Sequence, residues 1–197
     1  MADANALLSR RAVVTRILGG NDEVLAIGGL GNAGYDLVAA RGEHPLNFTI
    51  HGAGMGGAPA MGLGVAVAQP DRRVVVVLGD GDMLMGLTSL ATICAVKPDN
   101  LAIVVMDNEH YQETGNQPTA TRFGVDIAAM ARGAGFRLAF TLAEPSQLDE
   151  AVDHVLRARG PVLVTVKIDA ASSPQLPKIR DGVLMKHRFR ERLLGKA

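Results

Sequence analysis

The chain has 197 residues, of which 48% are hydrophobic and 20% charged, and its formal net charge is zero. This length is typical of one domain with a sizeable core, so we expect a single domain over residues 1–197. No run reaches the roughly 20 apolar residues of a membrane span, and no secretory leader is evident, which favours a cytoplasmic protein with neither a membrane nor a nucleic acid as partner. Cys94 is the only cysteine, which excludes an intrachain disulfide and a thiolate zinc site.

Four apolar runs rich in β-branched residues alternate with segments of helical spacing. They cover residues 24–27, 74–78, 101–106 and 162–166. Runs that are apolar on both faces are typical of a parallel sheet covered by helices on each side. The sequence therefore predicts an α/β fold with one doubly wound parallel sheet, in the order helix, strand, helix, glycine-rich helix, strand, helix, strand, helix, strand, helix.

A glycine pattern follows the first predicted strand. Gly29-Leu-Gly31-Asn-Ala-Gly34 matches the G-x-G-x-x-G turn of dinucleotide-binding proteins. An NAD site also needs a second strand that ends in an acid about 20 residues later. Residues 41–51, which include Pro45, fit a loop better. An NAD-binding oxidoreductase is thus kept only as an alternative from a different class, with Gly31 and Asn32 expected at a strand-to-helix turn near a ligand.

The strongest motif lies at the ends of the two central runs. The second run leads into Gly79-Asp80-Gly81-Asp82, and the third ends at Asp107-Asn108. A crossover helix over residues 83–96, with Met83 and Met85 in its core, would bring both motifs to the carboxyl edge of the sheet. The oxygens of Asp80 and Asn108 are donors that Mg²⁺ prefers, and Gly81 would let backbone N–H groups meet a phosphate. The longest loop, residues 109–122, follows at the same edge.

Gly-Asp-Gly followed at this spacing by Asn resembles the signature of thiamine-diphosphate enzymes. Residues 79–119 are similar to the small cofactor-binding subunits of sulfopyruvate and phosphonopyruvate decarboxylases, and a weaker likeness extends over nearly the whole chain. The resemblance implies a Mg²⁺-dependent carboxy-lyase that converts an anionic 2-oxoacid into an aldehyde and CO₂. An acetolactate-synthase-like carboligase and a 2-oxoacid oxidoreductase subunit remain alternatives.

The resemblance also implies roles for individual residues. Asp80 and Asn108 would bind Mg²⁺ through their side chains and His110 through its carbonyl. Met55, within Ala53-Gly54-Met55-Gly56, would prop the cofactor in a bent form, and the Ala53 carbonyl would accept a hydrogen bond from it. The catalytic candidates are Met55, His51 and His110. The expected cofactor-binding residues are Gly31, Asn32, Ala53, Gly54, Met55, Gly79, Asp80, Gly81, Asp82, Asn108, His110 and Tyr111.

Three features depart from the family pattern or extend beyond it. Asp82 would repel a diphosphate by about 4 kcal/mol at 4 Å if its carboxylate pointed inward, so we expect it to contribute only its N–H or to point away.

No second domain is evident that would bind the cofactor's pyrimidine ring, so the chain is expected to need a separate pyrimidine-binding α subunit in an α₂β₂ or larger hetero-oligomer. Residues 175–197 form a basic C-terminal segment, expected as a solvated helix.

Overall fold

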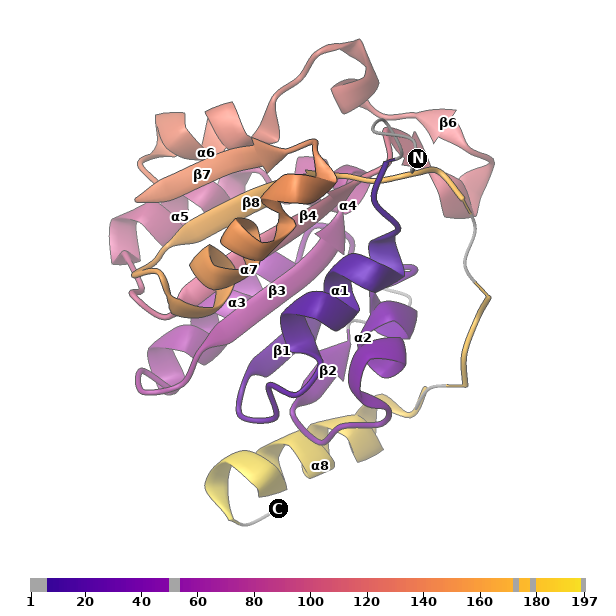
Figure 1. Ribbon diagram of the computed structural model, residues 1–197. Coiled ribbons are helices and arrows are strands. Elements are labelled where there is room, and N and C mark those ends of the chain that lie inside the picture. The colour runs from indigo at the N-terminus through magenta and orange to yellow at the C-terminus, as the bar shows by residue number, and fades with distance from the viewer. Residues whose placement is uncertain (1–6, 50–53, 172–173, 178–179, 196–197) are drawn as a thin grey trace.

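A six-stranded parallel sheet forms the centre of the computed structural model, which describes residues 7–49, 54–171, 174–177 and 180–195 (Figure 1). The strand order is β2-β1-β3-β4-β8-β7, and every neighbouring pair is parallel. This confirms the predicted α/β fold. The strands are β1 (Leu25–Gly28), β2 (Asn47–Thr49), β3 (Val74–Gly79), β4 (Leu101–Asp107), β7 (Leu138–Leu142) and β8 (Val162–Lys167).

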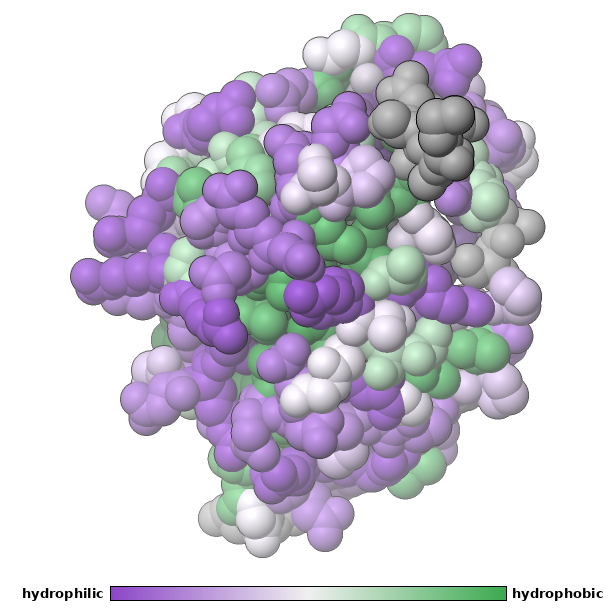
Figure 2. Space-filling view, viewed as in Figure 1, coloured by the Kyte–Doolittle hydropathy of each residue, from purple (hydrophilic) through white to green (hydrophobic). Residues whose placement is uncertain are grey.

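Helices cover both faces of the sheet. One face carries α1 (Arg10–Leu18), α2 (Ala33–Arg41) and α7 (Leu148–Arg157), and the other carries α3 (Ala58–Ala68), α5 (Thr88–Val96) and α6 (Ile127–Ala134). Figure 2, which views the first face, shows polar side chains over α1, α2 and α7, with hydrophobic residues visible between α1 and α7. No helix among the described residues has both the length and the apolar character needed to cross a bilayer.

The four predicted strands are confirmed because their apolar runs are buried on both sides. Val74, Val75, Val76 and Val77 are all fully buried, and alternate members join the two core clusters on opposite faces. Each such side chain contributes roughly 1.5–3 kcal/mol relative to an exposed one. These central strands therefore fix the sheet.

Two edge strands were not predicted. Residues 41–51 were expected as a loop, yet Asn47–Thr49 pairs with β1 as the short edge strand β2. The second omission is β7 with the preceding α6, where a single helix was expected between the third and fourth apolar runs. β7 is only partly buried, and β2 has three residues, so neither produces a continuous apolar run.

The predicted crossover helix over 83–96 is also wrong as a single helix, because it is split into α4 (Asp80–Met85) and α5. The break lies at Gly86, where a Cβ atom would come within 2.3 Å of the Gly56 carbonyl oxygen. Met83 is buried as predicted, but Met85 is 61% exposed. Two residues correspond to about 200° of helical rotation, so the two methionines face opposite sides.

The basic C-terminal segment contains α8 (Gly182–Leu194), which lies beside β2. Phe189 packs edge-on against Phe48 with ring centroids 5.4 Å apart. The Asp181 carboxylate caps the helix by accepting from two backbone N–H groups. Arg188 donates to the Glu43 carbonyl at 2.8 Å, so part of the basic charge is used within the chain.

Candidate cofactor and metal site

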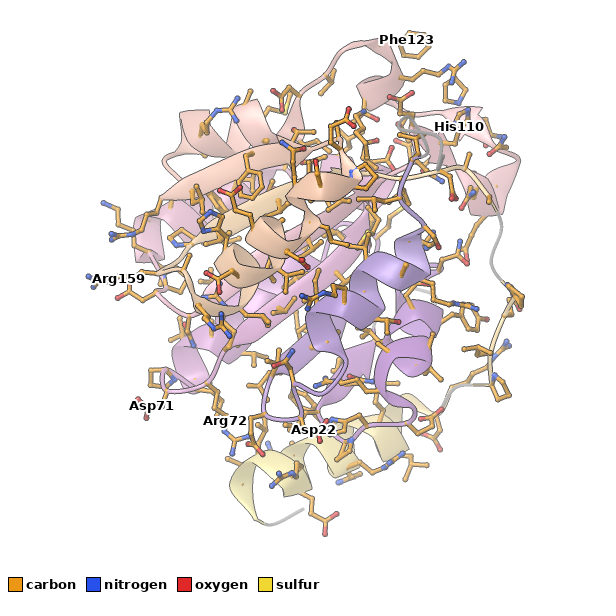
Figure 3. The ribbon with its side chains drawn as sticks, in the orientation of Figure 1. Asp22, Asp71, Arg72, His110, Phe123 and Arg159 are labelled. Atoms are coloured by element: carbon orange, nitrogen blue, oxygen red, sulfur yellow. The ribbon has the colours of Figure 1, made fainter. Side chains whose placement is uncertain are left out.

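A cavity of about 110 Å³ opens at the carboxyl ends of β1, β3 and β4. In Figure 3, His110 lies at the carboxyl ends of the strands, whereas Asp71, Arg72 and Arg159 lie at the amino ends. Most of the predicted site residues line it: Gly31, Asn32, Met55, Gly79, Asp80, Gly81, Asp82, Asn108, His110 and Tyr111. Gly54 is exposed and is not part of the wall, and His51 and Ala53 lie outside the described residues.

The register of the sheet explains why the two predicted metal ligands meet. Gly79 of β3 pairs with Met106 of β4, so Asp80 and Asn108 follow directly from neighbouring strand ends. The long loop after β4 is folded into a small hairpin of β5 (His110–Tyr111) and β6 (Gln117–Pro118). The 3-10 turn η1 (Gln112–Thr114) lies between these two strands, and a second, η2 (Ala120–Phe123), follows β6.

Asp80 is 1% exposed and is held by hydroxyl groups from η2 and the residue before it. Its Oδ2 accepts from Thr119 Oγ1 at 2.5 Å and from Thr121 Oγ1 at 3.2 Å. Burial, together with the nearby Asp107 carboxylate, raises the pKa of Asp80 to about 6. Ionising a carboxylate in this position is costly unless a cation offsets the charge.

The turn from Asn108 to His110 holds the other two predicted ligands. Asn108 Oδ1 accepts from the His110 N–H at 3.1 Å, and His110 Nδ1 lies 2.8 Å from the Asn108 carbonyl oxygen. Thr119 N–H donates to the Glu109 carbonyl at 2.9 Å, so His110 and Pro118 form a non-hydrogen-bonded pair of the hairpin and the His110 carbonyl faces away from β6. The His110 side chain lines the cavity, but its catalytic role stays a prediction.

These donors fit Mg²⁺. The ion favours oxygen ligands and is commonly bound by one or two protein side chains together with phosphate oxygens. Asp80 supplies a buried carboxylate, Asn108 an amide oxygen and His110 a carbonyl, all on the wall of one cavity. No cluster of three or more His, Cys, Asp or Glu residues occurs in the described part of the chain, and this donor set does not require one.

The sequence did not predict an ion-pair network that lies next to the turn from Asn108 to His110. Glu109 adopts φ 63, a left-handed conformation uncommon for a residue with a side chain. Lys167 Nζ at the end of β8 lies 2.8 Å from Glu109 Oε1 and 2.7 Å from Asp107 Oδ2. Asp107 in turn accepts from Thr121 at 2.8 Å, which connects Lys167 to Asp80. Lys167 is thus connected to the neighbours of both predicted side-chain ligands of the metal, Asn108 and Asp80.

The Gly79–Asp82 segment is open toward the cavity. A Cβ atom on Gly79 would meet nothing within 4 Å, whereas one on Gly81 would come within 2.2 Å of the Tyr111 ring. Gly81 is therefore needed for the ring to pack here. Because α4 has only six residues, the segment offers a diphosphate backbone N–H groups rather than the dipole of a long helix.

The Asp82 carboxylate is occupied by backbone donors. It accepts from Leu30 N–H at 2.9 Å and from Gly56 N–H at 2.5 Å. Burial raises the pKa of Asp82, and these two hydrogen bonds act in the opposite direction. Asp82 therefore ties the turn after β1 to the Met55–Gly56 turn. A cofactor-binding contribution from its N–H stays a prediction.

The rest of the cavity wall combines two predicted residues with several that carried no signal in the sequence. Gly31 and Asn32 lie in the turn from β1 to α2, as predicted, and Asn32 Nδ2 donates to Gln112 Oε1 at 3.3 Å. Arg10 also lines the cavity, although it lies about 70 residues before the Gly-Asp-Gly motif. The wall further includes Leu30, Met106, Gln112, Glu113 and Thr114.

Comparison with known proteins agrees with this geometry. The family model described as "Thiamine pyrophosphate enzyme, C-terminal TPP binding domain" matches residues 26–166. The chain is 37% identical over 162 residues to the sulfopyruvate decarboxylase subunit beta of Methanothermobacter thermautotrophicus, covering 82% of this chain and 83% of that one. It is 40% identical over 151 residues to the phosphonopyruvate decarboxylase of Streptomyces hygroscopicus, covering 76% of this chain but 37% of that protein.

A solved structure shares the fold. A protein from Mycobacterium smegmatis described as a "putative thiamin diphosphate-dependent enzyme" superposes with a TM-score of 0.70 at 24% identity. The match covers 84% of this chain and 32% of the other. The same arrangement of sheet and helices thus occurs as one part of a longer polypeptide.

Proposed function

The chain belongs to the thiamine pyrophosphate enzyme family, and on this premise we propose that it is the diphosphate-binding subunit of a 2-oxoacid decarboxylase. The observation that carries the proposal is the placement of Asp80 and Asn108 at paired strand ends on one cavity wall. The likeness to a decarboxylase subunit over most of both chains supports the choice of reaction.

In this proposal the residues of the site divide into three groups. Asp80, Asn108 and the His110 carbonyl hold Mg²⁺, which anchors the diphosphate. Backbone N–H groups of the Gly79–Asp82 segment meet the phosphate oxygens, and Met55 supports the cofactor rings. When bound, thiamine diphosphate supplies the electron sink that allows a 2-oxoacid to lose CO₂, while the protein supplies position and electrostatics.

We propose an anionic 2-oxoacid of the 3-sulfopyruvate or 3-phosphonopyruvate type as substrate. The support is the names of the related decarboxylases, one acting on each type of acid. The assay that tests the function uses this chain co-expressed with its partner subunit and supplied with Mg²⁺ and thiamine diphosphate. Release of CO₂ with an equal amount of aldehyde supports a decarboxylase, whereas a condensed hydroxy-oxoacid product would identify a carboligase.

A separate pyrimidine-binding subunit is part of the proposal. The related sulfopyruvate decarboxylase chain is named a beta subunit, and this chain covers only 37% of the longer phosphonopyruvate decarboxylase. Large apolar side chains are exposed on segments next to the site: Met85 at 61% and Phe123 at 76%. Phe123 extends outward at the tip of its loop in Figure 3. We propose an α₂β₂ or larger assembly in which the partner covers this edge.

Met55 provides a test of how the cofactor is supported. Met55→Leu keeps a similar volume and should retain most of the turnover in the assembled enzyme. Met55→Gly should reduce kcat by about 100-fold, the effect of misplacing reacting groups by about 1 Å, with a smaller effect on cofactor affinity. Steady-state kinetics and calorimetric titration of thiamine diphosphate measure the two effects. Equal losses of kcat in both variants would mean that Met55 is ordinary packing.

A further inference from the structure

Arg10, the first residue of α1, is a buried cation on the wall of the cofactor cavity. The residue is 6% exposed, and its Nε donates to Asp36 Oδ2 at 2.7 Å. Among the described residues that line the cavity, it is the only Lys or Arg. Its two terminal guanidinium nitrogens make no hydrogen bond within the described part of the chain.

The guanidinium of Arg10 is paired with Asp36 through Nε, and the residue also lines the cavity. Removing a cation from water is costly unless it is paired and its donors are satisfied. Asp36 is fully buried and is shared with a second guanidinium, since Arg11 Nε lies 3.8 Å from Asp36 Oδ1. Nε is thereby fixed, and the forked end of Arg10 is the part of the side chain that remains for a ligand.

The other charged side chains on the described wall of the cavity are acidic. Asp80, Asp82 and Glu113 contribute carboxylates, whereas Arg10 contributes the single fixed positive charge among the described residues of the wall. A diphosphate brings further negative charge, and one Mg²⁺ bound at Asp80 offsets only part of it. An arginine fork matches phosphate oxygens with two parallel hydrogen bonds.

We infer that Arg10 is a cofactor-binding residue whose guanidinium binds the diphosphate of thiamine diphosphate while Asp36 holds it in place. This inference rests on the proposed function, because it assumes that the diphosphate occupies the Asp80 cavity. Asp36 is then a positioning residue, since it acts through Arg10. α1, which precedes the residues matched by the family model, thereby becomes part of the site.

Calorimetric titration of the purified full-length chain with Mg²⁺-pyrophosphate tests the inference without requiring turnover. The main variant is R10Q/D36N, which removes both charges together and so leaves no buried carboxylate without its partner. We expect its affinity for Mg²⁺-pyrophosphate to fall about 10-fold to 100-fold, the usual range for a hydrogen bond to a charged group. Arg10→Lys keeps the charge but loses the fork, and should show a smaller loss.

Arg11→Gln is the matched control, because Arg11 also neighbours Asp36 but does not line the cavity. It should bind Mg²⁺-pyrophosphate as tightly as the wild type. If the wild-type chain binds Mg²⁺-pyrophosphate and R10Q/D36N binds it equally tightly, the inference about Arg10 is overturned and the site assignment stands. A wild-type chain that does not bind Mg²⁺-pyrophosphate would overturn the site assignment and the inference together. Should the double variant fail to fold, unchanged affinity in Arg10→Lys would overturn the inference.

Discussion

Asp80→Ala should abolish Mg²⁺-dependent binding of thiamine diphosphate to the assembled enzyme. The substitution removes the only carboxylate proposed to bind the metal, together with the hydrogen bonds that Asp80 accepts from Thr119 and Thr121. Even outer-shell partners of a metal are worth about 10–100-fold in affinity, so the loss of a direct ligand should exceed 100-fold. Calorimetric titration of the cofactor, with and without Mg²⁺, measures the effect.

The fold should tolerate this change. Burial raises the pKa of Asp80 to about 6, so an ionised carboxylate is unfavourable at this position, and in the variant Thr121 can still donate to Asp107 and Thr119 to Thr121. Thermal unfolding monitored by circular dichroism should therefore remain cooperative. Asp71→Ala is the matched control, because Asp71 lies in an exposed turn at the opposite edge of the sheet (Figure 3) and should leave cofactor affinity unchanged. Normal affinity in Asp80→Ala would refute the metal assignment.

The central strands were predictable because their burial is encoded locally. Each residue of β4 is buried, so its apolar run has no polar face and stands out in the sequence. β2 and β7 lie at the two edges of the sheet and owe their pairing to the neighbouring strand rather than to their own composition. Edge strands of this kind depend on tertiary context, which a local pattern does not contain.

The site was predictable where its residues directly follow strands. Asp80 and Asn108 could be placed together because parallel strands end at one edge. Arg10 and Lys167 gave no such signal, since a basic residue on an amphipathic helix or at a strand end normally faces solvent. Their roles arise from the packing of α1 against α2 and of β8 beside β4. Long-range pairs of this type, such as Arg10 with Asp36, become visible only in the folded chain.

The helix surfaces on the α3–α5 face of the sheet are unusual in lacking charge. The outward residues are small or apolar, with two threonines, and comprise Ala60, Gly64, Val67, Ala68, Thr88, Ala91, Thr92, Ala95 and Val96. α3 begins three residues after Met55, which lines the cavity. An exposed face without charges is typical of a surface that is covered in an assembly. We propose that the pyrimidine-binding subunit packs here.

A charge placed in this face should therefore weaken assembly. Ala91→Glu on α5 should lower the affinity for the partner by more than about 10-fold, because a carboxylate buried in an apolar interface lacks a counter-charge. Ala12→Glu introduces the same change at an exposed position of α1, on the opposite face of the sheet, and should have no effect. Size-exclusion chromatography of each variant co-expressed with the partner measures the assembled fraction. Equal assembly of both variants would place the interface elsewhere.

The chain alone should be catalytically silent and become active only with that partner. The cavity offers ligands for the metal and diphosphate, but its described wall is formed by the carboxyl edge of one sheet and opens to solvent. A cofactor bound there without a second subunit would have rings unsupported on one side and water in contact with the reacting atoms, both of which oppose decarboxylation. We expect turnover by the isolated chain to be at least about 100-fold below that of the complex, the scale of loss when reacting groups are misplaced.

A coupled aldehyde assay on the isolated and co-expressed forms, with Mg²⁺ and thiamine diphosphate in both, makes the comparison. Full decarboxylase activity in the isolated chain would contradict the two-subunit model and would require that these 197 residues complete the site unaided.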